Sequence, residues 1–366
     1  MEQSVHIVNQ ETDENAWSEF RLQIKNLSPA YFALVMATGI ISIAAYLMEM
    51  SVLAKVLFVL NNIFFVTLWV LNLLRLIWFL KETISDLTNH MKCPGYFTSV
   101  AGTCVLGSQY IILFDNFTIA FILLIAGVLL WIFLTYLIFT TLTIKQEKPP
   151  LDKGITGAWL TAIVATQSVS ILSALIASHL KQPFRMEVNF FALSMWLWGG
   201  MFYIWMISLI FYRYTFFKFS PDDLAPPYWI NMGAMAISTL AGCILIINSP
   251  DAPFLQTLLP FMKGFTVFYW ATGTWWIPML IILAIWRHVY KKYPLKYDPL
   301  YWGAVFPQGM YTVCTFRMAE ALHIPFVQKI SDVFIYIALS AWTLAFIGLL
   351  RNIVSKTRQI TKLLIQ

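Results

Sequence analysis

The stretch TGAWLTAIVATQSVSILSALI, residues Thr156–Ile176, carries the features that decide the fold of this chain. It is apolar and just long enough to cross the hydrocarbon of a bilayer as a helix, yet small polar residues gather in its middle. A longer and more aromatic stretch, Val188–Phe217, follows it. Together they predict two membrane helices, of which only the first carries a polar face.

The same alternation of a short and a long apolar stretch runs through the chain in five pairs. Short stretches hold roughly 17 to 23 residues and long ones roughly 26 to 33, against about 20 for an upright membrane helix. Composition agrees, because 59% of the residues are hydrophobic and 11% are charged. We therefore predict an all-α integral membrane protein with ten transmembrane helices. The short stretches are Pro29–Met48, Phe97–Leu113, Thr156–Ile176, Tyr228–Ile247 and Leu300–Leu322, and the long ones are Val52–Leu80, Phe117–Ile144, Val188–Phe217, Phe254–Trp286 and Pro325–Leu350.

Connection lengths predict how these helices pair. In four of the five pairs only a few residues join the short stretch to the long one, as at Glu49–Ser51, whereas the return connections are longer. This pattern predicts five helical hairpins in series. We expect residues 28–350 to form one transmembrane domain, flanked by a cytoplasmic tail at 1–27 and a basic cytoplasmic tail at 351–366.

The basic residues predict the orientation, because loops rich in Lys and Arg stay in the cytoplasm. Of the 24 Lys and Arg, 18 fall in the two tails and the return connections or at the span ends beside them, 4 fall on the opposite side and 2 lie inside spans. Both termini are therefore expected in the cytoplasm of a multi-pass cell-membrane protein. The net charge of +6 reflects this topology and anionic lipid headgroups rather than nucleic acid.

The N-terminal tail contains one apolar pattern. Trp17, Phe20, Ile24 and Leu27 share a helical face, which suits a short helix in the membrane interface. The alternative is a frayed lead-in to the first span.

Motifs for catalysis or for cofactors are missing from the sequence. The four cysteines have no metal-ligand spacing, and the five histidines fall in tails or connections, where no pair could hold a haem in the membrane. Phosphate-binding glycine loops and nucleophile elbows are also lacking. We expect no enzyme activity, no metal and no cofactor.

Polar residues divide the spans into two sets, because each short span has a small-polar midsection while the long spans are aromatic and aliphatic. Polar faces on five helices can be satisfied together where they meet around a wet or narrow axis. This favours an inner ring of the odd-numbered helices around a pore. The alternative is that Gly, Ser and Thr only permit close packing. The residues expected to line the pore are Thr38, Gly39, Gly107, Ser108, Thr166, Gln167, Asn231, Gly233, Gln308 and Thr312.

Almost no acidic residue lies in the short spans, so a cation would find no carboxylate ring. Hydroxyls, amides and a basic excess favour anions, although a channel for neutral solutes could carry similar residues.

Several motifs resemble those of a known family, the tellurite-resistance/dicarboxylate transporter family. Its relatives include bacterial tellurite-resistance proteins, fungal malate permeases and plant guard-cell slow anion channels. The resemblance covers nearly all of residues 28–350. The motifs are SPAYFALVMATGI (Ser28–Ile40), ATQSVSIL (Ala165–Leu172), PPYWINMGAMA (Pro226–Ala236), FYWATGTWW (Phe268–Trp276) and, most specific, YWGAVFPQGMYTVCTFRMAE (Tyr301–Glu320).

The resemblance implies a homotrimer with one pore in each subunit, and a phenylalanine on the ninth helix that blocks the pore. That residue corresponds to Phe306, and Pro307 beside it would kink the helix and free the ring to swing. The alternative is a packed aromatic side chain next to a kink.

Charged residues near the far ends of three spans form a second group. Lys263, Arg317, Glu320 and Asp332 are expected to line an outer vestibule, where the bases attract anions and the acids limit how tightly they bind. The alternative for Arg317 and Glu320, three residues apart on one helix, is an internal ion pair.

Three functions remain open from the sequence. The first is a passive anion channel or uniporter for chloride, nitrate, malate or similar anions. The second is a proton-coupled carrier of malate-like dicarboxylates, in which Glu320 or Asp332 takes up the proton. The third is a membrane sensor or scaffold that transports nothing.

Overall fold

The structure is a computed structural model that describes residues 17–295 and 297–365. The N-terminal tail expected before residue 17 lies outside the described residues. All regular secondary structure within the described ranges is helical. Nine of the described helices are long and apolar enough to cross a membrane, which confirms an all-helical, multi-pass membrane protein. Helix α13 (Trp302–Leu322) falls outside this group of nine because it carries Pro307, Gln308, Arg317 and Glu320.

Five helices form a closed inner ring. Each packs against the next along the chain, and the last returns to contact the first. Their side chains are largely buried: in the four inner helices that qualify as membrane spans, 78 to 94% of the most apolar window is enclosed by protein, against 17 to 44% in the outer helices. The inner helices are α2 (Ala33–Leu47), α5 (Phe97–Phe114), α8 (Thr161–Ala177), α10 (Ile230–Asn248) and α13 (Trp302–Leu322).

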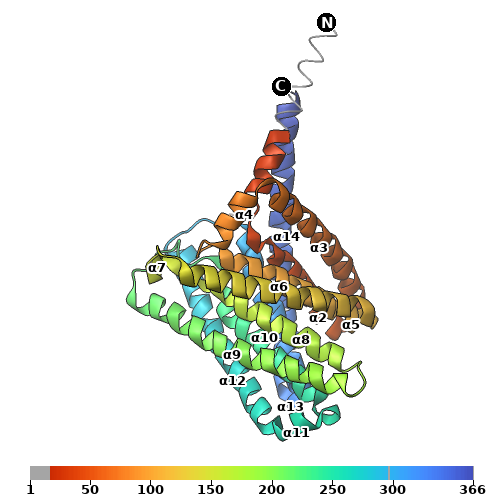
Figure 1. Ribbon diagram of the computed structural model, residues 1–366. Helices are drawn as coiled ribbons and strands as arrows, with labels where there is room; N and C mark the ends of the chain where they lie inside the picture. The colour runs from red at the N-terminus through yellow and green to blue at the C-terminus, as the bar shows by residue number, and fades with distance from the viewer. Residues whose placement is uncertain (1–16, 296, 366) are drawn as a thin grey trace.

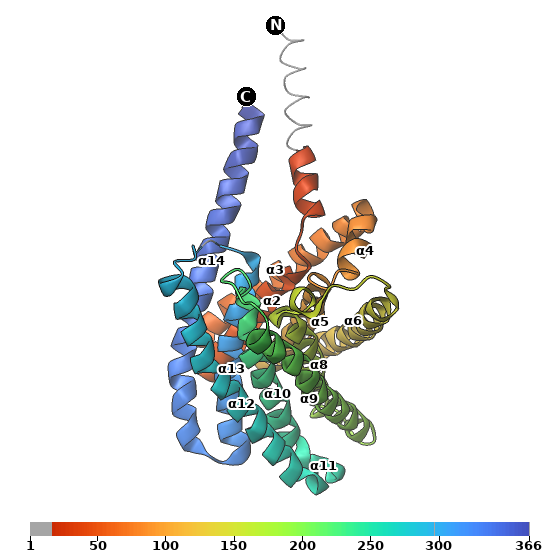
Figure 2. The same ribbon diagram turned by 90° about the vertical axis from the view of Figure 1, so that its left-hand side faces the viewer.

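Five longer helices surround this ring (Figure 1, Figure 2). Each packs against the inner helix that precedes it in the chain and against the next inner helix around the ring. Apolar side chains cover their outward surfaces, as expected for contact with lipid. The outer helices are α3 (Ser51–Trp78), α6 (Phe117–Ile144), α9 (Phe184–Phe216), α12 (Leu259–Ile285) and α14 (Gln328–Ile365).

A side-chain hydrogen bond joins each outer helix to the next inner helix around the ring. In four cases a tryptophan indole N–H is the donor, and in the fifth an asparagine amide donates to a glutamine. Each bond satisfies a polar group that would otherwise be buried without a partner. The pairs are Asn61–Gln109 (2.6 Å), Trp131–Thr166 (2.9 Å), Trp196 to the Ser238 carbonyl (2.8 Å), Trp270–Thr315 (3.0 Å) and Trp342–Thr38 (3.0 Å).

A short 3₁₀ turn precedes every inner helix, and the five turns also contact one another in a closed ring. Their sequences are alike, with Pro or Gly followed two residues later by Tyr or Trp. Three of them are capped in the same way, because the Ser28, Thr156 and Asp298 side chains accept from the backbone N–H two residues on. The turns are η1 (Pro29–Phe32), η2 (Cys93–Tyr96), η3 (Gly157–Leu160), η4 (Pro226–Trp229) and η7 (Pro299–Tyr301).

The two ends of the described chain lie on one side of the molecule, where the helix at residues 17–25 and the end of α14 both emerge (Figure 1, Figure 2). We call this the terminal side and the opposite face the distal side. All five inner helices begin on the terminal side and run in parallel to the distal side.

Buried arginines fix two of the return connections on the terminal side. Arg75 at the end of α3 pairs with Asp86 at 2.5 Å, and Arg213 at the end of α9 pairs with Asp223 at 2.8 Å. Partial burial raises the pKa of Asp223, but hydrogen bonds from Ser220 and Arg213 outweigh it and hold this pKa below its ordinary value.

Several elements differ from the expected ones. Helix α14 continues to Ile365 rather than ending near Leu350, because the end of an apolar stretch does not itself end a helix. The span expected from Phe254 is divided into α11 (Pro253–Thr257) and α12, and Pro260 lies in the first turn of the latter. The connection after α3 contains a further helix, α4 (Leu80–Leu87).

Candidate functional site

Two small cavities lie along the axis of the inner ring, and every inner helix contributes to each. The terminal cavity is lined by the five 3₁₀ turns and the first residues of the helices, and the distal cavity by the second halves of the helices. Each encloses about 20 Å³, little more than the roughly 10–15 Å³ that one water molecule needs. The axis is therefore almost closed in this state.

The lining residues occupy the same positions in all five repeats when they are counted from the Tyr or Trp of the preceding 3₁₀ turn. We call this shared numbering the register, and it places the lining residues in rings of five. Two rings line the terminal cavity and two complete rings line the distal one. From the terminal side these rings are Ala30, Gly95, Ala158, Pro227 and Leu300; Ala33, Thr98, Thr161, Ile230 and Gly303; then, beyond a central level, Ile40, Val105, Ser168, Ile237 and Met310; and Ile43, Ser108, Ile171, Leu240 and Val313.

Phe306 lies at the central level that separates the cavities. The same register places Met36, Ala101, Val164 and Gly233 beside it. Phe306 and Met36 line the terminal cavity, and Phe306 is 1% exposed. Because three members of this ring are small, the phenyl ring is its bulkiest side chain.

Pro307 follows Phe306 inside α13 without ending the helix. It has no N–H to donate to the Gly303 carbonyl one turn earlier. Its ring packs against Gly233 of α10, where an added Cβ would lie 2.7 Å from the proline Cγ. The structure thus brings together Phe306, Pro307 and Gly233.

Serine and threonine hydroxyls in the cavity walls donate to backbone carbonyls. Ser108 bonds the Cys104 carbonyl at 3.0 Å and Ser168 the Val164 carbonyl at 2.7 Å, each within its own helix. Thr98 and Thr161 bond the carbonyl three residues earlier, of Gly95 and Ala158, and also reach carbonyls of the preceding repeat, Pro29 and Pro94. A hydroxyl can rotate to another acceptor, so the two serines are the hydroxyl donors that the distal cavity can offer a solute.

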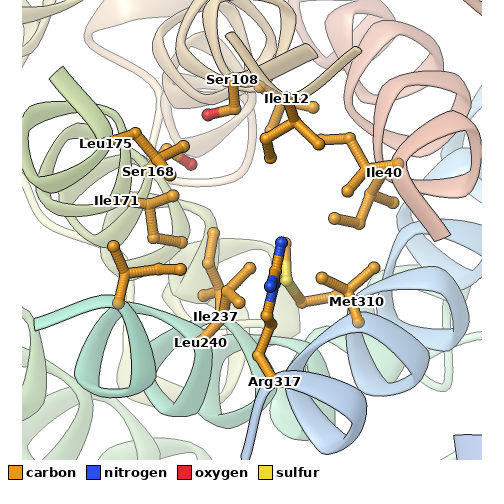
Figure 3. Close-up of a pocket in the computed structure, with 14 residues that line it drawn as sticks. Ile40, Ser108, Ile112, Ser168, Ile171, Leu175, Ile237, Leu240, Met310 and Arg317 are labelled. Carbon is orange, nitrogen blue, oxygen red and sulfur yellow. The ribbon is translucent and has the colours of Figure 1, made fainter. Parts of the chain in front are cut away.

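Arg317 projects into the distal cavity (Figure 3). Among the described residues that line the two cavities, it is the only one with an ionisable side chain. Its Nη1 donates to Glu320 Oε2 at 2.8 Å, so the ion pair expected from the three-residue spacing is present. Asp332 is exposed on α14, and Lys263 is partly buried on α12, outside the inner ring.

Most of the polar side chains expected in the pore instead face the outer helices. Gln167 donates to the Trp196 carbonyl of α9 at 3.1 Å, and Asn231 donates to the Tyr214 hydroxyl of the same helix at 3.0 Å. Thr38 and Thr166 accept the indole bonds described above. The structure corrects the expected lining at these positions, because each of the four side chains makes a hydrogen bond to an outer helix.

The remaining expected lining residues are divided between helix contacts and the axis. Gly39 and Gly107 allow close packing, since an added Cβ at either would lie 2.6 Å from Val105 or Leu172. Thr312 donates to the Gln308 backbone carbonyl within α13, and neither residue lines one of the two axial cavities. Ser108 is the one expected polar residue that lines a described cavity.

Sequence reasoning missed the apolar rings, although a signal for them exists. The motifs SPAYF (Ser28–Phe32), CPGYF (Cys93–Phe97), TGAWL (Thr156–Leu160), APPYW (Ala225–Trp229) and DPLYW (Asp298–Trp302) set a common register for all five repeats. Aligning the short spans on them places every cavity-lining residue in its ring.

A wider groove of about 330 Å³ lies away from the axis. It is formed by residues of α6, α9 and the adjoining connections, including His90, Lys148 and Trp159. Only part of the ring contributes to it, so it does not continue the axial path.

These features define a multi-pass membrane protein with a narrow axial lumen inside a ring of helices. The chain matches the voltage-dependent anion channel family over residues 26–350 and belongs to that family. This confirms the resemblance noted from its motifs.

Relatives support the same assignment. Two uncharacterized transporters of Methanocaldococcus jannaschii are 26% identical over 343 residues and 27% identical over 336 residues. These matches cover 91% and 88% of this chain and 96% and 92% of the relatives. An uncharacterized membrane protein of Mycobacterium tuberculosis is 39% identical over 151 residues, which are 41% of this chain and 76% of the relative.

Proposed function

We propose that this protein is a passive anion channel or uniporter whose conducting path is the axis of the inner ring. The observation that carries the proposal is the pair of coaxial cavities, each lined by all five inner helices and separated at Phe306. In this proposal α13 is a tenth membrane span, and the ten helices form five hairpins. Its neighbours cover its polar residues, so it does not need the apolar surface of a lipid-facing helix.

Phe306 is proposed as the gate. Its phenyl ring closes the path by excluding water and ions from an apolar constriction. Pro307 leaves a backbone carbonyl free in the adjacent turn, which makes this part of α13 easier to deform than an ordinary helix. A modest displacement of the ring would join the two cavities.

Electrostatics along the path favour anions. The five inner helices are parallel, so the positive ends of their dipoles converge on the terminal cavity. The described cavity linings contain no carboxylate. At the distal mouth we propose that Arg317 and Lys263 attract anions, while Glu320 and Asp332 limit how long they stay.

The gate is tested by Phe306→Ala in proteoliposomes. We expect a several-fold rise in chloride conductance, because the largest side chain at the constriction is removed. Phe97→Ala is the matched control: Phe97 is fully buried on α5 but packs toward Phe139 of α6 rather than into a cavity. Equal conductance in the wild type and Phe306→Ala would refute the gate.

Chloride, nitrate and malate are the candidate solutes, and a proton-coupled malate carrier is the alternative mechanism. Glu320 supports this alternative, since its half-exposed carboxylate lies beside the distal cavity. Flux of chloride and of malate should be compared with and without an imposed pH gradient. A channel passes anions down their own gradients in both conditions, whereas a carrier accumulates malate only when the pH gradient is present.

The remaining expectations are proposals about location and assembly. We propose a homotrimer in the cell membrane with both termini in the cytoplasm. Light scattering of the detergent-solubilised protein, corrected for bound detergent, would give the subunit number.

A further inference from the structure

The distal cavity contains one unusual group, the Arg317 guanidinium. Its register matches that of Ile112, Leu175 and Ile244, which line the same cavity from α5, α8 and α10. Arg317 thus introduces a positive charge into a ring that is otherwise apolar. Figure 3 shows the guanidinium directed toward the centre of the cavity, with the Ser108 and Ser168 hydroxyls across from it.

Most N–H groups of the guanidinium have no hydrogen-bond partner within the described part of the chain. It has five N–H donors in a planar fork. One of them donates to Glu320 Oε2 at 2.8 Å, and no other acceptor for Arg317 is found in that part of the chain. The arginine side chain is 24% exposed, so its free donors face the cavity and its mouth.

Glu320 is a weakly held partner. It follows Arg317 by three residues on the same helix, and its side chain is 44% exposed at the distal mouth. Exposed ion pairs of this spacing contribute little to stability. The carboxylate can therefore turn to solvent and leave the guanidinium to another anion at small cost.

We infer that Arg317 is an anion-binding subsite of the lumen and that Glu320 is a tethered competitor for it. A solute anion entering the distal cavity displaces the Glu320 carboxylate, and Glu320 returns when the anion leaves. This rests on the proposed anion path and adds a residue that discriminates anions from cations.

The geometry also indicates the class of anion. One cation surrounded by apolar side chains can neutralise a single negative charge, such as that of chloride, nitrate or a monocarboxylate. The second carboxylate of a four-carbon diacid would need a second cation, and Lys263 lies on α12, outside the ring of lining residues. We therefore assign monovalent anions to this subsite in preference to malate.

The experiment uses Phe306→Ala as background, so that conduction does not depend on natural gating. Arg317→Gln, Arg317→Lys and Glu320→Gln are added to it, and Lys329→Gln is the control. Lys329 is an exposed cation at the start of α14 on the same side of the molecule. Reversal potentials in a KCl gradient give the chloride-to-potassium permeability ratio.

Arg317→Gln should lower this ratio at least about fivefold, the effect of losing one moderately screened charge close to the path. Arg317→Lys should keep most of it, and Lys329→Gln should leave it unchanged. Glu320→Gln should lower the half-saturating chloride concentration several-fold, because the competitor is gone. Replacing chloride by malate should lower conductance more in the background protein than in Arg317→Gln.

A second readout separates this inference from the channel itself. Chloride binding to the solubilised protein broadens the ³⁵Cl NMR line, and Arg317→Gln should remove the Arg317-dependent part. An unchanged permeability ratio and an unchanged line width would overturn the subsite. If Phe306→Ala does not conduct, the channel proposal fails, while the line width still decides whether Arg317 binds chloride. Weaker chloride binding in Glu320→Gln would overturn the competition.

Discussion

Gly200 on α9 is a residue at which even one methyl group has no room. An added Cβ would overlap the hydroxyl of buried Tyr269, on α12. We predict that Gly200→Ala destabilises the protein by about 1–3 kcal/mol, the usual cost of overpacking a close contact. Thermal unfolding in detergent, followed by circular dichroism, measures the change.

Gly264 on α12 provides the control for this prediction. Among the described residues, no atom beyond the adjoining backbone of α12 and the two chain neighbours lies within 4 Å of the Cβ that alanine would add there. Gly264→Ala should therefore gain up to about 1 kcal/mol from higher helix propensity. Equal melting temperatures for the two variants would contradict close packing between α9 and α12 at this point.

Hydroxyl side chains explain why the lining could not be predicted residue by residue. Ser108, Thr166 and Ser168 all donate to a carbonyl four residues earlier in their own helices. Such a side chain is satisfied on any face of a helix, so its presence marks burial without saying what it faces. Phe306 lines the terminal cavity, but the expectation that it is the gate came from family resemblance rather than from its own chemistry.

The hydrogen bonds between outer and inner helices also influence how the helices are ordered around the ring. Each outer helix is hydrogen-bonded to the next inner helix around the ring, so every pair of inner and outer helices is held by both neighbouring pairs. In a membrane, apolar packing alone gives little preference for one helix neighbour over another, and directed hydrogen bonds add it. The indole donors therefore help to set the order of helices around the ring.

Trp131→Phe tests this attachment between α6 and α8. The substitution keeps an aromatic ring but removes the donor to Thr166, which lies 2.9 Å away. We expect a loss of about 0.6–1 kcal/mol in unfolding free energy, measured by denaturant titration in mixed micelles. Trp205→Phe is the control, since Trp205 is 47% exposed on the surface of α9. A loss of equal size in Trp205→Phe would attribute the effect to packing instead of the bond.

At the level of elements, hydropathy located the helices well but not all of their ends. The span expected at Phe117–Ile144 coincides with α6, because both ends of this helix fall where the apolar stretch ends. The extension of α14 to Ile365 could not be anticipated, since a helix outside the membrane leaves no mark in hydropathy. Helix α13 was predicted from the alternation of short and long stretches, although it is the least apolar of the ring.

For the whole molecule, the repeat of five similar units accounts for the single axis. Each unit places a turn, an inner helix and an outer helix in the same relation to the next unit, and the fifth unit returns to the first. Parallel inner helices follow from this arrangement, so the two ends of the ring differ, with the 3₁₀ turns at one end and Arg317 near the other. The orientation of the protein in the membrane therefore determines which end of the ring faces the cytoplasm. That end is either the one formed by the 3₁₀ turns or the one near Arg317.

The excess of Lys and Arg on the terminal side predicts that this side is cytoplasmic. Two single-cysteine variants, Lys181→Cys and Asp222→Cys, test this by labelling with a membrane-impermeant maleimide. Both residues are exposed; Lys181 precedes α9 and Asp222 follows it. Asp222→Cys should react only after the cells are permeabilised, and Lys181→Cys should react in intact cells. The native cysteines are all buried, so the wild type gives the background.

A second pair, Lys291→Cys and Lys329→Cys, brackets α13 in the same way. Labelling of both members of this second pair from one side would mean that α13 does not cross the membrane and that the ring cannot enclose a transmembrane path.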